Sequence, residues 1–126
     1  MKKISLVFIL LSGIIMTGSC QQKEKTITAD SLQVVLKTEK VVVLDVRTPE
    51  EYAEGHLQGA LNIDYRNENF AARVDSLDKT QKYEVYCRSG HRSGESVKIM
   101  TEKGFNAYNL TGGILEWQQK GFEVVK

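Results

Sequence analysis

The stretch Tyr83-Glu84-Val85-Tyr86-Cys87-Arg88-Ser89-Gly90-His91-Arg92-Ser93 passes from a strand pattern, through a loop of small and cationic residues, into a helical pattern that continues to Lys103. In a parallel α/β sheet, ligands bind beyond the carboxyl ends of the strands, where the next helices begin. Cys87 occupies such a junction. This stretch therefore predicts an α/β fold and places a candidate functional residue at the edge of its sheet.

Strand and helix patterns also alternate on both sides of this stretch. Residues 41–44 form a continuous apolar run, which is typical of a strand covered on both faces in a parallel sheet. Thr48-Pro49-Glu50-Glu51 has the pattern of a capping box with proline at the first helical position. The alternation predicts a single α/β domain with a central, mostly parallel sheet of about five strands and helices on both faces. Further strands are expected at residues 60–63 and 107–110, and further helices at residues 30–38, 70–77, 93–103 and 114–120.

Cys87 lies in surroundings that favour a reactive thiolate. The pKa of a free cysteine, about 8.5, falls at a helix N-terminus or beside cationic side chains. Arg88, His91 and Arg92 supply the cations, and Gly90 lets the backbone curl so that several N–H groups point inward. The alternative is a cysteine that serves only as a small buried apolar residue. Such polar neighbours are costly to bury, so the sequence favours a nucleophile.

The first twenty residues have the pattern of an export signal. Lys2 and Lys3 precede an apolar run at residues 4–16, which is too short for a typical membrane span. Thr17-Gly18-Ser19-Cys20 resembles the lipobox of bacterial lipoproteins, which implies that residues 1–19 are removed and Cys20 is acylated. Residues 20–28 would then form a lipidated tether and residues 29–126 the folded domain. An ordinary secretory signal or an uncleaved anchor is the alternative.

The lipobox resemblance implies an exported lipoprotein that is anchored to the membrane and faces the periplasm or the cell surface. Removal of Lys2 and Lys3 lowers the formal net charge from +1 to −1, so no basic surface is available to bind nucleic acid. With Cys20 lipidated, Cys87 is the remaining thiol of the two cysteines. The two histidines have no metal-ligand spacing with it. Neither a metal nor an organic cofactor is expected, and we expect a monomer.

Four sequence blocks, in order, resemble those of a single-domain rhodanese, a sulfurtransferase. The similarity extends from about Ile27 to the C-terminus. The blocks are Leu44-Asp45-Val46-Arg47 with Pro49-Glu50-Glu51-Tyr52, then Glu54-Gly55-His56-Leu57-Gln58-Gly59-Ala60, the loop at residues 87–93, and Leu110-Thr111-Gly112-Gly113 with Trp117.

The rhodanese resemblance implies a double-displacement mechanism. The thiolate of Cys87 would attack the sulfane sulfur of a small anionic donor such as thiosulfate, expel sulfite and carry the sulfur as a persulfide. A thiol, cyanide or a protein acceptor would then take that sulfur. Backbone N–H groups and a helix dipole would stabilise the thiolate and the persulfide. The substrate-binding residues implied are Arg88, Ser89, Gly90, His91, Arg92 and Ser93.

Two other functions fit parts of the same pattern. Phosphatases and arsenate reductases of this fold have five residues between the cysteine and the arginine, whereas Cys87 and Arg92 are separated by four, so the shorter loop suits a single sulfur atom better than a phosphate. A sulfur-carrying or partner-binding module without turnover is the second alternative. Inactive rhodanese-like domains commonly lack the loop cysteine, so Cys87 favours an active enzyme.

Several other polar or aromatic residues are expected to have structural roles. Asp45 and Arg47 flank the expected mouth of the sheet and could orient the active-site loop. An aspartate at a strand end more often fixes a neighbouring turn or pairs with an arginine, so a structural role is expected. His56 lies in a glycine-rich turn and is expected to form hydrogen bonds rather than to act as a general base. Trp117 is expected in the core or at the rim of a pocket.

Overall fold

The computed structural model of the chain describes residue 18 and residues 24–126. Most of the expected signal peptide and the expected lipidation site Cys20 lie outside the described residues. In the part that is described, no helix is long and apolar enough to cross a membrane.

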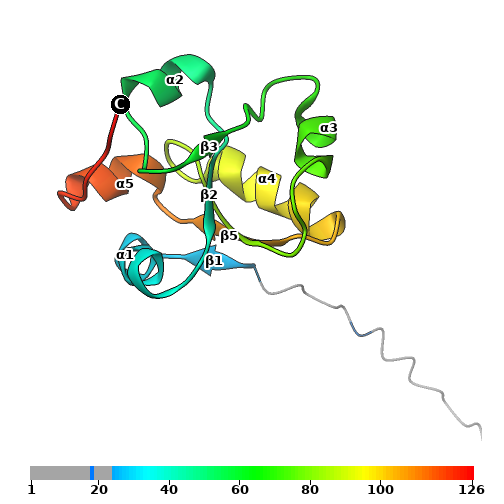
Figure 1. The fold of residues 1–126 in the computed structure, drawn as a ribbon, viewed down its shortest axis with the longest axis horizontal. Coiled ribbons are helices and arrows are strands. Elements are labelled where there is room, and N and C mark those ends of the chain that lie inside the picture. Colours follow the sequence, from blue (N-terminus) through cyan, green and yellow to red (C-terminus); the bar gives the residue numbers. More distant parts are fainter. Residues whose placement is uncertain (1–17, 19–23) are drawn as a thin grey trace, which may run out of the picture.

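The centre of the fold is a five-stranded sheet with the order β1-β5-β4-β2-β3, in which all strand pairs are parallel (Figure 1). Helices cover both faces of this sheet, and α2 follows the carboxyl end of β2. The predicted fold class, a central parallel sheet between helices, is therefore confirmed. The strands are β1 (Thr26–Ile27), β2 (Val42–Asp45), β3 (Leu61–Asn62), β4 (Lys82–Tyr86) and β5 (Asn106–Leu110), and the helices are α1 (Ala29–Thr38), α2 (Pro49–Glu54), α3 (Phe70–Asp75), α4 (His91–Glu102) and α5 (Gly113–Gln119).

Each face of the sheet has its own apolar core. Val43 of β2 packs in a cluster with residues of α1 and α5, whereas its neighbour Leu44 packs in a cluster with residues of α3 and α4. Successive side chains of a strand point to opposite faces, so a strand buried on both faces needs an uninterrupted apolar run. Trp117 is 3% exposed and belongs to the core between α5 and the sheet, one of the two places expected for it.

Two elements differ from the sequence-based expectation. The edge strand β1 lies within residues 20–28, the expected tether, and Thr26 pairs with Asn109 of β5. The sheet therefore begins before residue 29. Helix α4 begins at His91 rather than at residue 93, because Gly90 adopts a left-handed φ of 104° as N-cap and its carbonyl already accepts the Gly94 N–H at 3.0 Å. The loop between β4 and α4 is consequently only four residues long, 87–90.

Candidate active site

Cys87 directly follows β4, at the carboxyl edge of the sheet, and is 1% exposed. Its Sγ accepts a hydrogen bond from the Gly90 N–H at 3.1 Å and another from the Ser93 hydroxyl at 3.3 Å. Ser93 lies in the first turn of α4 and is itself buried. The early start of α4 therefore brings a helix N-terminus, with its partial positive charge, to the sulfur.

The hydrogen bonds to Cys87 favour its ionised form. Burial raises the pKa of the Cys87 thiol, because it removes the charged sulfur from water. The Ser93 hydroxyl and the backbone N–H groups of Ser93, Gly90 and Ser89 lower it, and together they outweigh burial. The pKa of Cys87 thus lies below its ordinary value, as a nucleophilic thiolate requires.

The start of helix α5 packs against the loop at residues 87–90. The Ile114 N–H donates to the Cys87 carbonyl at 2.9 Å, and the Leu115 N–H donates to the Arg88 carbonyl at 3.1 Å. A Cβ on Gly113 would lie 2.6 Å from the Cys87 carbonyl oxygen and closer still to that of Arg88. Gly113, the first residue of α5, thus has a steric reason, because only glycine at this position allows the helix to approach the loop this closely.

The three basic residues next to Cys87, which are Arg88, His91 and Arg92, have different surroundings. Arg92 forms a bidentate ion pair with Glu51 of α2, with Nη1 at 2.8 Å from Oε2 and Nη2 at 3.0 Å from Oε1. Hydrogen bonds from Arg92, together with the Thr48 N–H, lower the pKa of Glu51 to about 2 despite its partial burial. The pair is therefore charged at neutral pH. Arg88 and His91 are exposed, so their side chains face solvent.

A second arginine–carboxylate pair lies beneath the loop. The Arg47 Nη2 is 2.6 Å from Asp45 Oδ2 and also donates to the Gly55 carbonyl at 2.7 Å. The Tyr86 hydroxyl donates to the same Asp45 oxygen at 2.7 Å and accepts the Leu57 N–H at 3.1 Å. This network ties the end of β2, the end of β4 and the turn after α2 together. Asp45 thus pairs with an arginine and accepts the backbone N–H of Arg47 in the turn after β2, as expected for an aspartate at a strand end.

A cavity of about 240 Å³ lies beside the loop, between α2 and α5. Arg88 contributes the loop side of its wall, Arg47, Glu51 and Glu54 contribute the α2 side, and Leu115 belongs to the α5 side. Of the arginines in this wall, Arg47 is bound to Asp45, whereas Arg88 has no ion-pair partner among the described residues. The cavity therefore has a mostly polar wall, and the guanidinium of Arg88, next to Cys87, is available to a ligand there.

The sequence missed two residues that shape the site. Glu51 was expected only in the capping box, which it does form with Thr48, and its bond to Arg92 adds a second task. Asn109 of β5 contacts the catalytic loop through the Gly90 carbonyl, 19 positions away in the chain. Neither contact has a local sequence signal, because each depends on how distant elements pack. No group of three or more potential metal ligands occurs within residues 24–126.

These features define a class of protein: a small parallel α/β domain in which a buried cysteine directly follows the central strand and accepts hydrogen bonds at the start of the next helix. The match to a family model extends over residues 28–120. The chain belongs to the family of rhodanese-like domains.

Relatives and solved structures agree with this assignment. A sulfurtransferase from Allochromatium vinosum is 34% identical over 101 residues, covering 79% of this chain and 92% of the relative. The thiosulfate sulfurtransferase PspE of Escherichia coli is 38% identical over 71 residues, covering 56% of this chain and 68% of PspE. The crystal structure of a rhodanese-related protein from Thermoplasma volcanium is similar with a TM-score of 0.74 at 32% identity, and the match covers 80% of this chain and 97% of that one.

Proposed function

We propose that this protein is a sulfurtransferase that carries sulfane sulfur on Cys87 between a small anionic donor, such as thiosulfate, and a thiophilic acceptor. One observation carries the proposal: the buried Cys87 Sγ accepts hydrogen bonds from the Gly90 N–H and the Ser93 hydroxyl at the start of α4. The sulfurtransferases among the relatives support the same chemistry.

The reaction has two displacements at sulfur. In the first, the Cys87 thiolate attacks the outer sulfur of thiosulfate, a bond forms between the two sulfurs, and the bond within the donor breaks so that sulfite leaves with the electron pair. In the second, an acceptor such as a thiolate or cyanide attacks the outer sulfur of the persulfide, and Cys87 leaves again as a thiolate. No net oxidation occurs at the protein.

The loop residues have distinct tasks in this mechanism. The Gly90 N–H and the Ser93 hydroxyl stabilise the negative sulfur of both the thiolate and the persulfide. Arg88, exposed and next to the cavity, attracts the anionic donor, and His91 adds an exposed polar group. Arg92 is already paired with Glu51, so its charge contributes less to donor binding than the sequence alone predicts.

Mass spectrometry of the reduced, folded protein after incubation with thiosulfate tests the proposal. We expect the mass to increase by one sulfur atom, the added sulfur to be located on Cys87, and the gain to disappear in Cys87→Ser. Transfer that persists in Cys87→Ser would refute the assignment. A folded wild type that gains no sulfur would favour the binding-module alternative, and efficient hydrolysis of aryl phosphates without sulfur transfer would favour the phosphatase alternative.

The same proposal includes export and lipid anchoring through Cys20, which rest on the lipobox-like pattern of residues 17–20. Outer-membrane delivery is favoured in a bacterium with two membranes, because the residue after Cys20 is Gln21 and not aspartate. Incorporation of labelled palmitate into the full chain, but not into Cys20→Ser, is the expected result. Equal labelling of the wild type and Cys20→Ser, or labelling of neither protein, would contradict lipidation at Cys20.

A further inference from the structure

The side chain of Asn109, on β5, contacts the loop that contains Cys87 through the backbone of Gly90. Its Nδ2 donates to the Gly90 carbonyl at 3.1 Å, while the N–H of the same glycine donates to Cys87 Sγ at 3.1 Å. We propose that Asn109 is a positioning residue: its side-chain amide holds Gly90 in the one orientation that directs the Gly90 N–H at Cys87. This inference rests on the proposed role of Cys87 as a thiolate nucleophile.

Gly90 needs external support because its own backbone is permissive. It has a φ of 104°, a left-handed value that glycine adopts readily, and glycine also samples the opposite sign readily. Its carbonyl accepts two donors, the Gly94 N–H at 3.0 Å and Asn109 Nδ2. The N–H and the carbonyl of Gly90 belong to the two peptide groups that meet at its Cα. Two donors on the carbonyl therefore restrict the φ and ψ of Gly90, and with them the direction of its N–H.

The hydrogen bonding of Asn109 indicates that its amide donor, and not its acceptor, makes the contact with the loop. The Gly90 carbonyl can only accept, so the atom that faces it must be the NH₂ group. The other amide atom, Oδ1, is buried without a hydrogen-bond partner among the described residues. A buried acceptor without a partner typically costs about 1–3 kcal/mol, so packing alone would favour an apolar side chain at this strand position.

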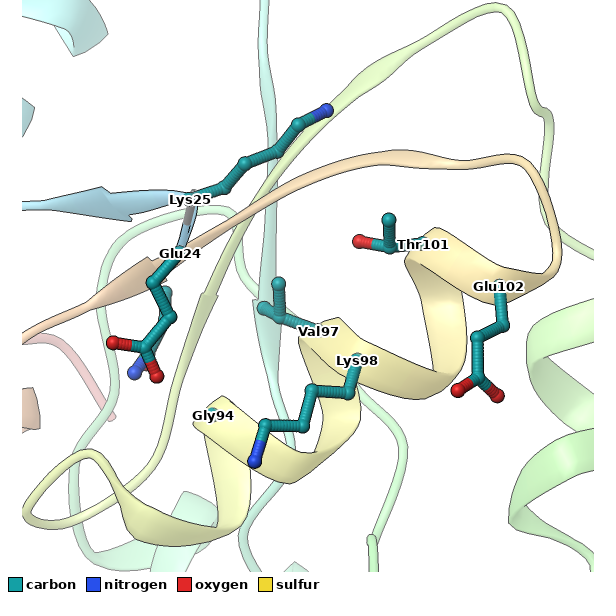
Figure 2. Close-up of a pocket in the computed structure, with 8 residues that line it drawn as sticks. Glu24, Lys25, Gly94, Val97, Lys98, Thr101 and Glu102 are labelled. Atoms are coloured by element: carbon teal, nitrogen blue, oxygen red, sulfur yellow. The ribbon is translucent and has the colours of Figure 1, made fainter. Parts of the chain in front are cut away.

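Helix α4 leaves space for Asn109. A Cβ on Gly94 would lie 3.3 Å from Asn109 Nδ2, which is closer than ordinary van der Waals contact. Gly94 and Val97 of α4, together with Lys25 and Asn109, line a cavity of about 520 Å³. Figure 2 shows Gly94 and Val97 on α4 and Lys25 on the neighbouring segment. Glycine inside a helix is less favourable than alanine by about 1 kcal/mol. Helix stability therefore favours alanine at position 94, and the position of Asn109 favours glycine.

The pH dependence of Cys87 alkylation by iodoacetamide tests this inference, because only the thiolate reacts. In Asn109→Ala we expect the apparent pKa of Cys87 to rise and alkylation at pH 7 to slow by about three- to tenfold, since one pKa unit corresponds to a factor of ten. Asn106→Ala is the matched control. Asn106 lies on the same strand, is exposed, and accepts from Lys25 Nζ rather than from the loop, so its profile should equal that of the wild type.

Gly94→Ala provides a second, independent arm. The added methyl group should displace the Asn109 amide and slow alkylation in the wild-type background, but it should have no effect on alkylation once Asn109 is alanine. Such non-additivity is the signature of two residues that act through one contact. If Asn109→Ala fails to fold, Asn109→Leu supplies the test, because leucine has a similar size and removes the donor without placing a negative charge near Cys87.

An unchanged alkylation profile in folded Asn109→Ala, or in folded Asn109→Leu, would overturn the inference. Additive effects of Asn109→Ala and Gly94→Ala would also overturn it. Alkylation needs no sulfur donor, so the two proposals fail separately. A wild type that alkylates normally but forms no persulfide would refute sulfur transfer and leave the positioning role of Asn109 intact.

Discussion

Asp45 at the end of β2 and Glu84 in the middle of β4 are both fully buried, and they lie on the same face of the sheet. Asp45 pairs in register with Tyr86, and Tyr86 and Glu84 are two residues apart on one strand. Asp45 accepts hydrogen bonds from Arg47 and from the Tyr86 hydroxyl. The two oxygens of Glu84 have no hydrogen-bond partner among the described residues, and the Lys82 Nζ lies 3.4 Å away.

The hydrogen bonding of the two carboxylates differs according to how near each lies to the candidate active site. Through Arg47 and Tyr86, Asp45 reaches Gly55 and Leu57, so its network holds the turn that borders the cavity next to the loop. Among the described residues, Glu84 forms no hydrogen bond or ion pair with the loop. The buried carboxylate that supports the candidate site, Asp45, therefore has hydrogen-bond partners. The buried carboxylate away from the site, Glu84, has none among the described residues. Three predictions test that contrast.

The largest effect is expected from Asp45→Asn. The change leaves the Arg47 guanidinium buried without a negative partner, and breaking a buried ion pair in this way typically costs about 3–5 kcal/mol. Urea denaturation at pH 7 measures the free energy of unfolding. The matched control is Asp30→Asn, which removes the exposed pair with Lys120 and should change stability by less than about 1 kcal/mol. A loss below about 1 kcal/mol in Asp45→Asn would show that the network contributes little.

The opposite sign is expected from Glu84→Met. An apolar side chain of similar size removes a buried carboxylate that lacks hydrogen bonds, while Lys82 keeps its pair with Glu39 at 3.2 Å. Replacement of poorly compensated buried charge by apolar residues is often neutral or stabilising, and here a gain of about 1–3 kcal/mol at pH 7 is expected. A variant less stable than the wild type at pH 7 would mean that Glu84 is better compensated than its contacts indicate.

The pH dependence of the Glu84 variant provides a second measurement. Burial raises the pKa of Glu84 above its ordinary value, and Lys82 only partly offsets this effect. Between the unfolded pKa, about 4.3, and the raised native value, the folded protein binds more protons, so the wild type loses stability as pH rises through that window. The advantage of Glu84→Met should therefore be larger at pH 7 than at pH 4. An advantage that is equal at both pH values would contradict this origin.

The same contrast separates what the sequence could predict from what it could not. Four of the five strands, the position of Cys87 and the pairing of Asp45 with an arginine follow from local patterns. Strand period, capping and neighbouring charges act over only a few residues. Glu84 reads as an ordinary polar residue in a strand, and its burial depends on the helix packed over it. Strand β1 is two residues long, too short for a period. These features arise only from tertiary packing.

The contact between Glu51 and Arg92 was unpredictable for the same reason. The two residues are 41 positions apart, and the sequence does not fix how α2 sits against the catalytic loop. As a result, the sequence placed Arg92 among the residues that attract a donor anion, whereas the structure gives its guanidinium a carboxylate partner in the protein.

The smallest effect on stability is expected from Glu51→Gln, which breaks this pair without removing the side chain. The pair is partly exposed, so its contribution is reduced by solvent screening, and a loss of about 1 kcal/mol or less at pH 7 is expected. Glutamine can still accept the Thr48 N–H, which preserves the capping box. Urea denaturation compares the two proteins.

The contribution of Glu51 to the free energy of unfolding depends on pH with the opposite sign to that of Glu84. Glu51 has a native pKa of about 2, below its ordinary value, because Arg92 and Thr48 stabilise the carboxylate. Its contribution is therefore present above the unfolded pKa, about 4.3, and is lost as pH falls from there towards 2. The difference between the wild type and Glu51→Gln should shrink as the pH is lowered through that window. A difference that stays constant would assign the loss to the helix cap, since an uncharged hydrogen bond does not titrate, and the ion pair would then contribute nothing measurable to folding.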